Sequence, residues 1–356
     1  MAVEDHAGKP VGVGYANPHS LIAVRLLCGP GEEVGPKLIT DRIFRARALR
    51  ERLCPGREAY RAVYSESDLL PGLVVDRYGT WLSVQVTTAG MERLLPVVLD
   101  GLREAYRPDG IVLRNDSKLR ELEGLPLTKR VVEGDYKGAV AVDISGIRFM
   151  VDMMEGQKTG FFLDQVDNYH MLDQIAKGSE MLDMFCHTGA WALYAAKAGA
   201  ASVTGVDSSA SALKAAAENA RANGFDGGLE GGVSFIEGDA FDALKRLDSA
   251  GRKFDVVVVD PPAFIKNRSK IAEGLKGYRD VNVRAMRVVK PGGYLVSCSC
   301  SHHLEREAFR DMLRSAASGA VRTARLIEMR SQSKDHPALL GAPETEYLKC
   351  ALVQVL

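Results

Sequence analysis

The fold is decided by the stretch Met181-Leu182-Asp183-Met184-Phe185-Cys186-His187-Thr188-Gly189, after which a helix is expected to begin. A short apolar run that contains a single acid, Asp183, is typical of a buried strand. A glycine at the end of the loop lets a ligand approach the backbone, and the following helix offers free N–H groups. The stretch lacks the dinucleotide-binding pattern G-x-G-x-x-G, so by itself it indicates a binding loop without identifying the ligand.

Short apolar runs alternate with helical patterns on the C-terminal side of this stretch. Strands are expected at 181–185, 202–207, 233–239, 254–260 and 293–300, with two more at 326–329 and 348–356. Helices are expected at 190–197, 209–223, 240–246, 275–289 and 305–317. Such alternation predicts a parallel sheet with helices on both faces, whose ligands bind at the carboxyl ends of the strands.

Acidic side chains stand at four of these strand ends. Asp183 belongs to the first strand, Asp207 and Asp239 end the next two, and Asp260-Pro261-Pro262 follows the fourth. An acid after the second strand can bind ribose hydroxyls, and one after the third can accept from an exocyclic amine. For Asp207 or Asp239 alone, a helix N-cap is an equally good interpretation, and Asp-Pro-Pro can be a stiff turn. As an ordered set on one sheet, they favour a nucleoside-bearing cofactor.

The N-terminal half has a different rhythm. Residues 1–27 alternate like a short strand pair, glycines and prolines in 28–40 indicate a linker, and apolar spacing in 41–53 predicts a helix capped by Thr40 or Asp41. Strands at 60–64, 73–76, 82–87 and 110–113 with a helix at 92–106 indicate a small α+β domain over 41–150. The second domain is expected at 151–356.

Composition limits the class of protein. Lys+Arg and Asp+Glu are both 46, so the net charge of zero excludes an overall basic coat but permits a local basic patch. The sequence contains no apolar run of membrane-spanning length and begins with an acidic segment unlike a signal peptide, which favours a cytoplasmic location. The six cysteines have no metal-ligand spacing, and no metal is expected.

Two basic stretches are candidates for nucleic-acid contact. Seven arginines between Arg42 and Arg61 can neutralise phosphates or form a solvated helix face. The second stretch follows Asp-Pro-Pro directly and contains Lys266, Arg268, Lys270, Lys276 and Arg279. We favour this second stretch because it adjoins the expected site.

Several motifs together give the chain a family resemblance. They include KTGFFLDQ (158–165), DPPAF (260–264), GYRDVN (277–282), Ser-Cys-Ser (299–301), LPGLVVDRYG (70–79) and Asp335-His336-Pro337. With the strand-end acids, this set resembles class I S-adenosylmethionine-dependent methyltransferases, and within them the 23S ribosomal RNA large subunit methyltransferase I family. The resemblance implies a Rossmann-like α/β sheet, S-adenosylmethionine as cofactor, and methylation of cytosine C5 in RNA, either free 23S rRNA or a ribosome assembly intermediate.

The resemblance also implies roles for individual residues. Cys300 is the expected nucleophile that adds to cytosine C6, and Asp260 holds the edge of the base. Cofactor contacts are expected from Gln165, Asp183, Phe185, Thr188, Gly189, Asp207, Asp239, Ala240 and Asp260. Substrate contacts are expected from Pro261, Pro262, Phe264, Lys266, Arg268 and Arg279. A homodimer is also considered.

One departure from the family concerns the N-terminus. Family members begin with a complete RNA-binding PUA domain, whereas residues 1–27 match only its closing part.

Cysteine chemistry has competing interpretations. Most free cysteines are buried core residues, and Cys298 lies on the same strand face as Cys300. Cys300 is favoured because it is nearer the carboxyl end of the strand and falls within Ser-Cys-Ser. Cys186, in the cofactor loop, is interpreted as packing.

Three other functions remain as alternatives. An amino-group methyltransferase would have an aromatic directly after Pro-Pro, where Ala263 stands with Phe264 one residue later. A non-catalytic RNA-binding protein on the same fold is disfavoured by the presence of Asp183, Asp260 and Cys300. A nicotinamide dehydrogenase is disfavoured by the missing G-x-G-x-x-G.

Overall fold

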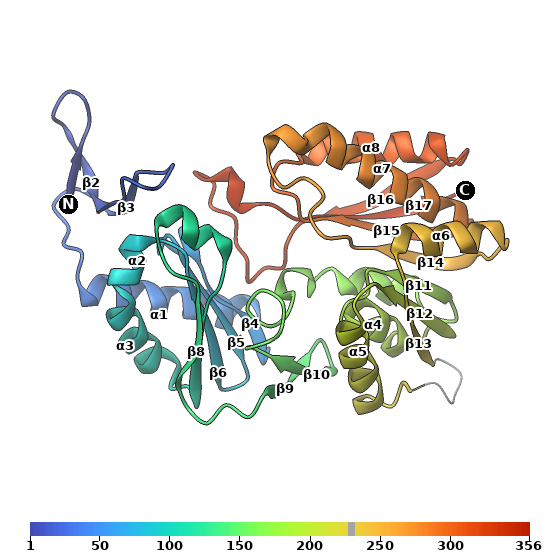
Figure 1. The fold of residues 1–356 in the computed structure, drawn as a ribbon, viewed down its shortest axis with the longest axis horizontal. Coiled ribbons are helices and arrows are strands. Elements are labelled where there is room, and N and C mark those ends of the chain that lie inside the picture. Colours follow the sequence, from blue (N-terminus) through green and yellow to red (C-terminus); the bar gives the residue numbers. More distant parts are fainter. Residues whose placement is uncertain (227–231) are drawn as a thin grey trace. The chain divides into compact units, whose positions relative to one another are not determined.

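The computed structural model describes residues 1–226 and 232–356, which form two compact units (Figure 1). Unit 1 contains residues 1–144, 149–163 and 334–345. Unit 2 contains residues 145–148, 164–333 and 346–356. Among the described residues, the search for a helix long and apolar enough to cross a membrane found none.

Unit 2 is built on a seven-stranded sheet with the order β13-β12-β11-β14-β15-β17-β16. The strands are β11 (Glu180–Met184), β12 (Ser202–Asp207), β13 (Val233–Glu237), β14 (Phe254–Val259), β15 (Val289–Ser299), β16 (Ala324–Arg330) and β17 (Lys349–Val355). The first five in spatial order are parallel, while β17 pairs antiparallel with both β15 and β16. The predicted α/β fold is confirmed, with an antiparallel edge added because β16 and β17 are joined without a crossover helix.

Helices cover both faces of this sheet. They are α4 (Ala190–Lys197), α5 (Ala210–Ala222), α6 (Ala240–Ser249), α7 (Ile271–Val288) and α8 (Arg306–Gly319). Figure 1 shows α7 and α8 on one side of the strands and α4 and α5 on the other. Because both faces are covered, the last four residues of β14, all valine, are fully buried.

Unit 1 contains a five-stranded sheet with the order β4-β5-β6-β7-β8. Its strands are β4 (Ala59–Tyr64), β5 (Leu73–Tyr78), β6 (Trp81–Val86), β7 (Gly110–Asn115) and β8 (Thr128–Glu133). The helices are α1 (Pro36–Leu53), α2 (Ala89–Arg93) and α3 (Leu95–Tyr106). A three-stranded sheet of β1 (Ala2–Glu4), β2 (Pro10–Ala16) and β3 (Val24–Cys28) precedes them, and β9 (Ala139–Ile144) pairs with β10 (Ile147–Asp152).

Two predictions for unit 1 were wrong in detail. Helix α1 begins at Pro36 with Gly35 as N-cap, so it takes up the last part of the segment predicted as linker, 28–40. Proline is well suited to the first turn, where its missing N–H is not needed. The helix expected at 92–106 is divided at Leu94 into α2 and α3, because Pro96 cannot donate within a continuous helix. The domain boundaries themselves remain predictions.

A buried arginine ties α1 to two other segments of unit 1. Arg50 is 1% exposed and donates to a carboxylate oxygen of Asp68 at 2.5 Å and to the backbone carbonyl of Asp335 at 2.9 Å. Asp335 in turn accepts from the backbone N–H of Arg61 at 2.7 Å. Burial raises the pKa of the Asp335 carboxyl, but His336 and the Arg61 N–H outweigh it and lower that pKa. Asp335 and His336 thus hold 334–345 onto unit 1.

We expect Arg50→Met to destabilise unit 1 by about 3–5 kcal/mol, because it leaves the buried Asp68 carboxylate without its cation. Urea unfolding followed by Trp81 fluorescence, in a Trp191→Phe background, measures this change. Lys37→Met is the matched control: the Lys37–Asp41 pair is exposed, so it should change stability by less than about 0.5 kcal/mol. Equal effects of the two variants would contradict the assignment.

Candidate functional site

The strand order of unit 2 reverses between β11 and β14. From β11 the chain proceeds outward to β12 and β13, whereas β14 lies on the other side of β11 and leads to β15. In the parallel register Met184 pairs with Val259, so the residues after these two strands emerge next to each other. Ligands of such sheets bind at this reversal, on the carboxyl edge.

The loop after β11 has an unusual backbone. Phe185, His187 and Gly189 all have positive φ, at 65°, 47° and 85°. The loop is tied to the neighbouring strand because the N–H groups of Phe185 and Cys186 both donate to the carbonyl of Val206. A side chain at Gly189 would come within 3.1 Å of Phe235 and 3.3 Å of Ala216. Glycine is therefore required here by both its φ and its surroundings.

Asp183 is buried within this edge. One of its carboxylate oxygens accepts from the backbone N–H of Ala192 at 3.1 Å. The other, Oδ1, has no hydrogen-bond partner among the described residues. Burial, followed by the charges of Asp260 and Asp207, raises the pKa of the Asp183 carboxyl well above its ordinary value. An acid oxygen without a partner in the protein can accept a hydrogen bond from a bound ligand or water.

Asp260 lies directly after β14 and is only partly buried. Its Oδ2 accepts from Gln165 Nε2 at 3.0 Å and from Trp191 Nε1 at 3.1 Å. The Gln165 side chain is itself held in place, because its Oε1 accepts a hydrogen bond from Asn168 Nδ2 at 2.7 Å. The structure thus brings Gln165, Asp183 and Asp260 together. Trp191 was not predicted for the site, and its position on the first turn of the helix after the loop was the available signal.

Asp207 and Asp239 are used by the backbone. Asp207 accepts from the N–H groups of His187 and Ser209 at 2.9 Å each, which holds the loop after β11 against the end of β12. Asp239 is the N-cap of α6 and accepts from Phe241 and Asp242, so the N-cap interpretation holds for it. Its exposed carboxylate and the adjacent Ala240 still lie on the carboxyl edge. Cofactor contact by these residues, and by Thr188 of the loop, remains a prediction.

The loop after Asp260 is anchored through Ser301. The backbone N–H of Ile265 donates to the Ser301 hydroxyl at 3.1 Å, and the Tyr278 hydroxyl lies 2.9 Å from the same oxygen. The Phe264 ring packs against Tyr278 with 4.7 Å between ring centroids. These contacts bring the 260–265 loop to the end of β15. Pro261 is buried and Pro262 exposed.

Cys300 follows the last residue of β15, beside Ser301. It is partly exposed, whereas the other five cysteines are buried. Cys298 is fully buried with its sulfur 3.3 Å from that of Cys350, as expected of a core residue. Burial also raises the pKa of the Cys186 thiol, in agreement with a packing role. The structure therefore places one accessible thiol on this edge.

The predicted basic contacts divide into two groups. Lys266 and Arg268 are exposed on the segment that continues from the 260–265 loop. Arg279 is held elsewhere, because its Nε donates to Ser315 of α8 at 2.9 Å. Substrate contact by Arg279 therefore stays a prediction, as it does for Lys266 and Arg268. In α1, Arg42 and Arg50 are buried, so they form neither a solvated face nor a phosphate contact.

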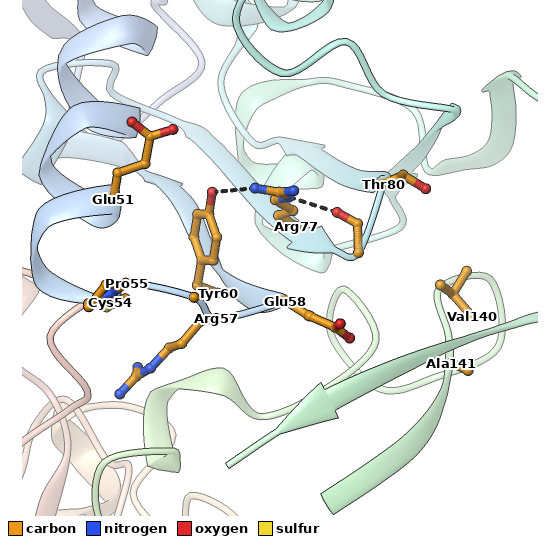
Figure 2. A pocket seen from close by; sticks show the side chains of 12 residues that line it. Glu51, Cys54, Pro55, Arg57, Glu58, Tyr60, Arg77, Thr80, Val140 and Ala141 are labelled. Atoms are coloured by element: carbon orange, nitrogen blue, oxygen red, sulfur yellow. Dashed lines mark hydrogen bonds between the residues drawn. The ribbon is translucent and has the colours of Figure 1, made fainter. Parts of the chain in front are cut away.

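Unit 1 contains a separate cavity of about 680 Å³ (Figure 2). Its lining includes two acids, Glu51 and Glu58, and two arginines, Arg57 and Arg77. Figure 2 shows Arg77 directed to the hydroxyl of Tyr60, to which it donates at 3.0 Å. Glu58 accepts from the backbone N–H of Asp143. These hydrogen bonds tie the lining side chains to neighbouring parts of unit 1.

Comparison with known proteins gives matches over the whole chain. A family model for S-adenosylmethionine-dependent methyltransferases matches residues 127–331, and a PUA-like domain model matches residues 1–28, which confirms the expected N-terminal segment. The ribosomal RNA large subunit methyltransferase I of Shewanella amazonensis is 38% identical over 98% of this chain and 89% of its own. The protein of the same name from Shewanella denitrificans is 37% identical, with coverage of 98% and 88%.

Solved structures show the same fold. SMU.776, a methyltransferase complexed with SAH, superimposes with a TM-score of 0.87 at 17% identity, over 99% of this chain and 90% of the other. At this identity the likeness concerns the fold alone.

Asp183→Asn should stabilise the ligand-free protein. The folded state raises the pKa of the Asp183 carboxyl. The contribution of this group to the free energy of unfolding is therefore fully present below its unfolded pKa, about 3.9, and is lost as the pH rises through the folded pKa. Asparagine keeps an acceptor for the Ala192 N–H without the buried charge. We expect a gain of about 1–3 kcal/mol at pH 7 that vanishes near pH 4. Urea unfolding followed by Trp191 fluorescence measures it; a variant less stable at pH 7 would contradict the burial argument.

Proposed function

Since the chain belongs to the ribosomal RNA large subunit methyltransferase I family of S-adenosylmethionine-dependent methyltransferases, we propose that it methylates C5 of a cytosine in 23S rRNA. In this proposal Cys300 forms a covalent bond to C6 of the target base. The observation that carries the proposal is the position of Cys300, the one partly exposed cysteine, beside the Ser301 hydroxyl that anchors the Asp-Pro-Pro loop.

The carboxyl edge fits S-adenosylmethionine. Asp183 offers a buried carboxylate oxygen with no partner among the described residues, and Gly189 opens α4 with no side chain over its N-terminus. Further contacts are assigned to Gln165, Phe185, Thr188, Asp207, Asp239, Ala240 and Asp260, which lie on or next to the same strand ends. When bound, S-adenosylmethionine supplies an electrophilic methyl group.

Cys300 makes cytosine reactive. C5 of cytosine is a weak nucleophile, and addition of the Cys300 thiolate to C6 converts the C5–C6 bond into an enamine that is nucleophilic at C5. After C5 has been methylated, loss of its proton restores the double bond and expels the thiolate. The thiolate is the reactive form, so the site must favour it over the thiol.

Asp260 is assigned to orient the base. Its two donors, Gln165 and Trp191, both approach Oδ2. This arrangement fixes the plane of the carboxylate, which is then available to hold the N3 or N4 edge of cytosine. Pro261 and Pro262 stiffen the loop, and Phe264 packs on Tyr278 beneath it. The target base must leave its stack to enter such a pocket.

The Phe264 contact also bears on the amino-group alternative. Enzymes of that class use an aromatic directly after Pro-Pro, whereas here Ala263 intervenes and Phe264 packs against Tyr278. This packing favours a structural role for Phe264 and the cysteine mechanism for the site.

The mechanism predicts a trapped adduct. RNA containing 5-fluorocytidine cannot lose a C5 proton, so incubation with enzyme and S-adenosylmethionine should leave a complex that survives denaturation. Gel electrophoresis in denaturant detects it. Cys300→Ala should abolish the adduct and methylation, whereas Cys298→Ala, the buried neighbour, should retain both. Full methylation of unmodified RNA by Cys300→Ala would contradict the covalent mechanism.

Lys266 and Arg268 are proposed to contact RNA phosphates. The double change Lys266→Ala and Arg268→Ala should weaken RNA binding about tenfold at low salt and, because two phosphate contacts are lost, reduce the slope of log Kd against log salt by about 1.5. Fluorescence anisotropy with labelled RNA measures both quantities. The control Lys214→Ala with Lys245→Ala removes two exposed charges from α5 and α6. An equal loss in the control would show a general charge effect instead.

A further inference from the structure

Lys349 is a buried lysine at the start of β17, opposite Ser299 on β15. Its ammonium group donates to the carbonyl of Ser301 at 2.7 Å and to the carbonyl of Tyr347 at 2.8 Å. The Ser301 carbonyl belongs to the residue directly after Cys300. Lys349 therefore connects β17, which is paired with β15 in the sheet, to the turn that carries the Cys300 thiol.

A neutral donor at position 349 could bond the same two carbonyls, and it would avoid the free-energy cost of burying the Lys349 charge. Burial lowers the pKa of Lys349 to about 8, and the leading influence that opposes this shift is the charge of Cys300. Glu305 and Glu346 act in the same direction, but both are exposed, and Glu346 lies 3.5 Å from Arg306. The ring of His302, two residues after Cys300, stacks on Tyr347 with 4.8 Å between ring centroids.

We propose that Lys349 is a positioning residue for Cys300, holding the turn through the Ser301 carbonyl and stabilising the thiolate by its positive charge. This role rests on the proposed function, in which that thiolate attacks C6. Lys349 forms no bond to substrate: the thiol proton leaves to solvent, and the ammonium supplies its positive charge near neutral pH.

Alkylation of the free enzyme tests the charge effect. Iodoacetamide reacts with the thiolate, so its rate at Cys300, followed by peptide mass spectrometry from pH 6 to 10, gives the midpoint of ionisation. In Lys349→Met the midpoint should rise by about one pH unit, which lowers the rate at pH 7 about tenfold. Lys349→Arg keeps the charge and should recover most of the rate. Lys290→Met, a partly exposed lysine paired with Asp255, is the matched control and should leave the midpoint unchanged.

A second measurement does not require Lys349 to be changed. Coupling between two titrating groups is reciprocal, so Cys300→Ser should lower the midpoint of Lys349, observed by NMR of labelled lysine side chains. A folded Lys349→Met protein with the wild-type alkylation midpoint would overturn the proposal. If that variant does not fold, an unchanged lysine midpoint in Cys300→Ser would overturn it instead.

These tests separate the proposal from the proposed function because neither uses RNA or S-adenosylmethionine. A normal coupling with no 5-fluorocytidine adduct would contradict the cysteine mechanism alone. An adduct that forms in an enzyme without the coupling would contradict the role of Lys349 alone.

Discussion

Two carboxylates share the centre of the carboxyl edge, and much of the site is arranged around the cost of that proximity. Asp183 belongs to β11, and Asp260 follows β14, the strand paired with it in parallel register. Each charge raises the energy of the other, which contributes to the raised pKa of the Asp183 carboxyl. The donors Gln165 and Trp191 are directed at Asp260 and the Ala192 N–H at Asp183, which offsets part of the repulsion.

The cysteine side of the edge is organised by a neutral hub instead. The Ser301 hydroxyl accepts from the Ile265 N–H and shares a hydrogen bond with the Tyr278 hydroxyl, and the Ser301 carbonyl accepts from the Lys349 ammonium. Three segments that are distant in sequence are thereby linked next to Cys300. All of these contacts are made by groups of the chain itself, and they hold the turn that carries the thiol.

The sequence predicted the parts of this arrangement that depend on local patterns. Apolar strand runs and strand-end acids led to the sheet, to Asp183 and to Asp260, because parallel strands align their carboxyl ends. Lys349 escaped prediction although a charged residue at the start of the apolar run 349–355 was a visible signal. Its partner Ser301 lies 48 residues earlier, and no periodicity reports such a pairing. The same holds for Arg50 and Asp335, which are 285 residues apart.

Local patterns also did not show whether an acid at a strand end bonds the protein backbone or a ligand. Asp239 satisfies the N–H groups of α6 as an N-cap, and Asp207 holds backbone N–H groups on both sides of it. An acid at a strand end has the same sequence whether its oxygens face a helix or a ligand, so only the folded geometry separates the two uses.

The part of the edge around Asp183 and the part around Ser301 differ in how well their polar and backbone groups are satisfied. The cofactor side contains an unpaired oxygen of the buried Asp183 and two residues other than glycine, Phe185 and His187, at positive φ. Each such feature is costly in the ligand-free protein and persists where the surrounding structure enforces it. A ligand that donates to Asp183 removes part of this cost, which adds to its own affinity. On the cysteine side the hydroxyl and the carbonyl of Ser301 both have hydrogen-bond partners within the chain. The carboxyl edge therefore combines an unsatisfied buried acid near β11 with a fully bonded serine at the end of β15.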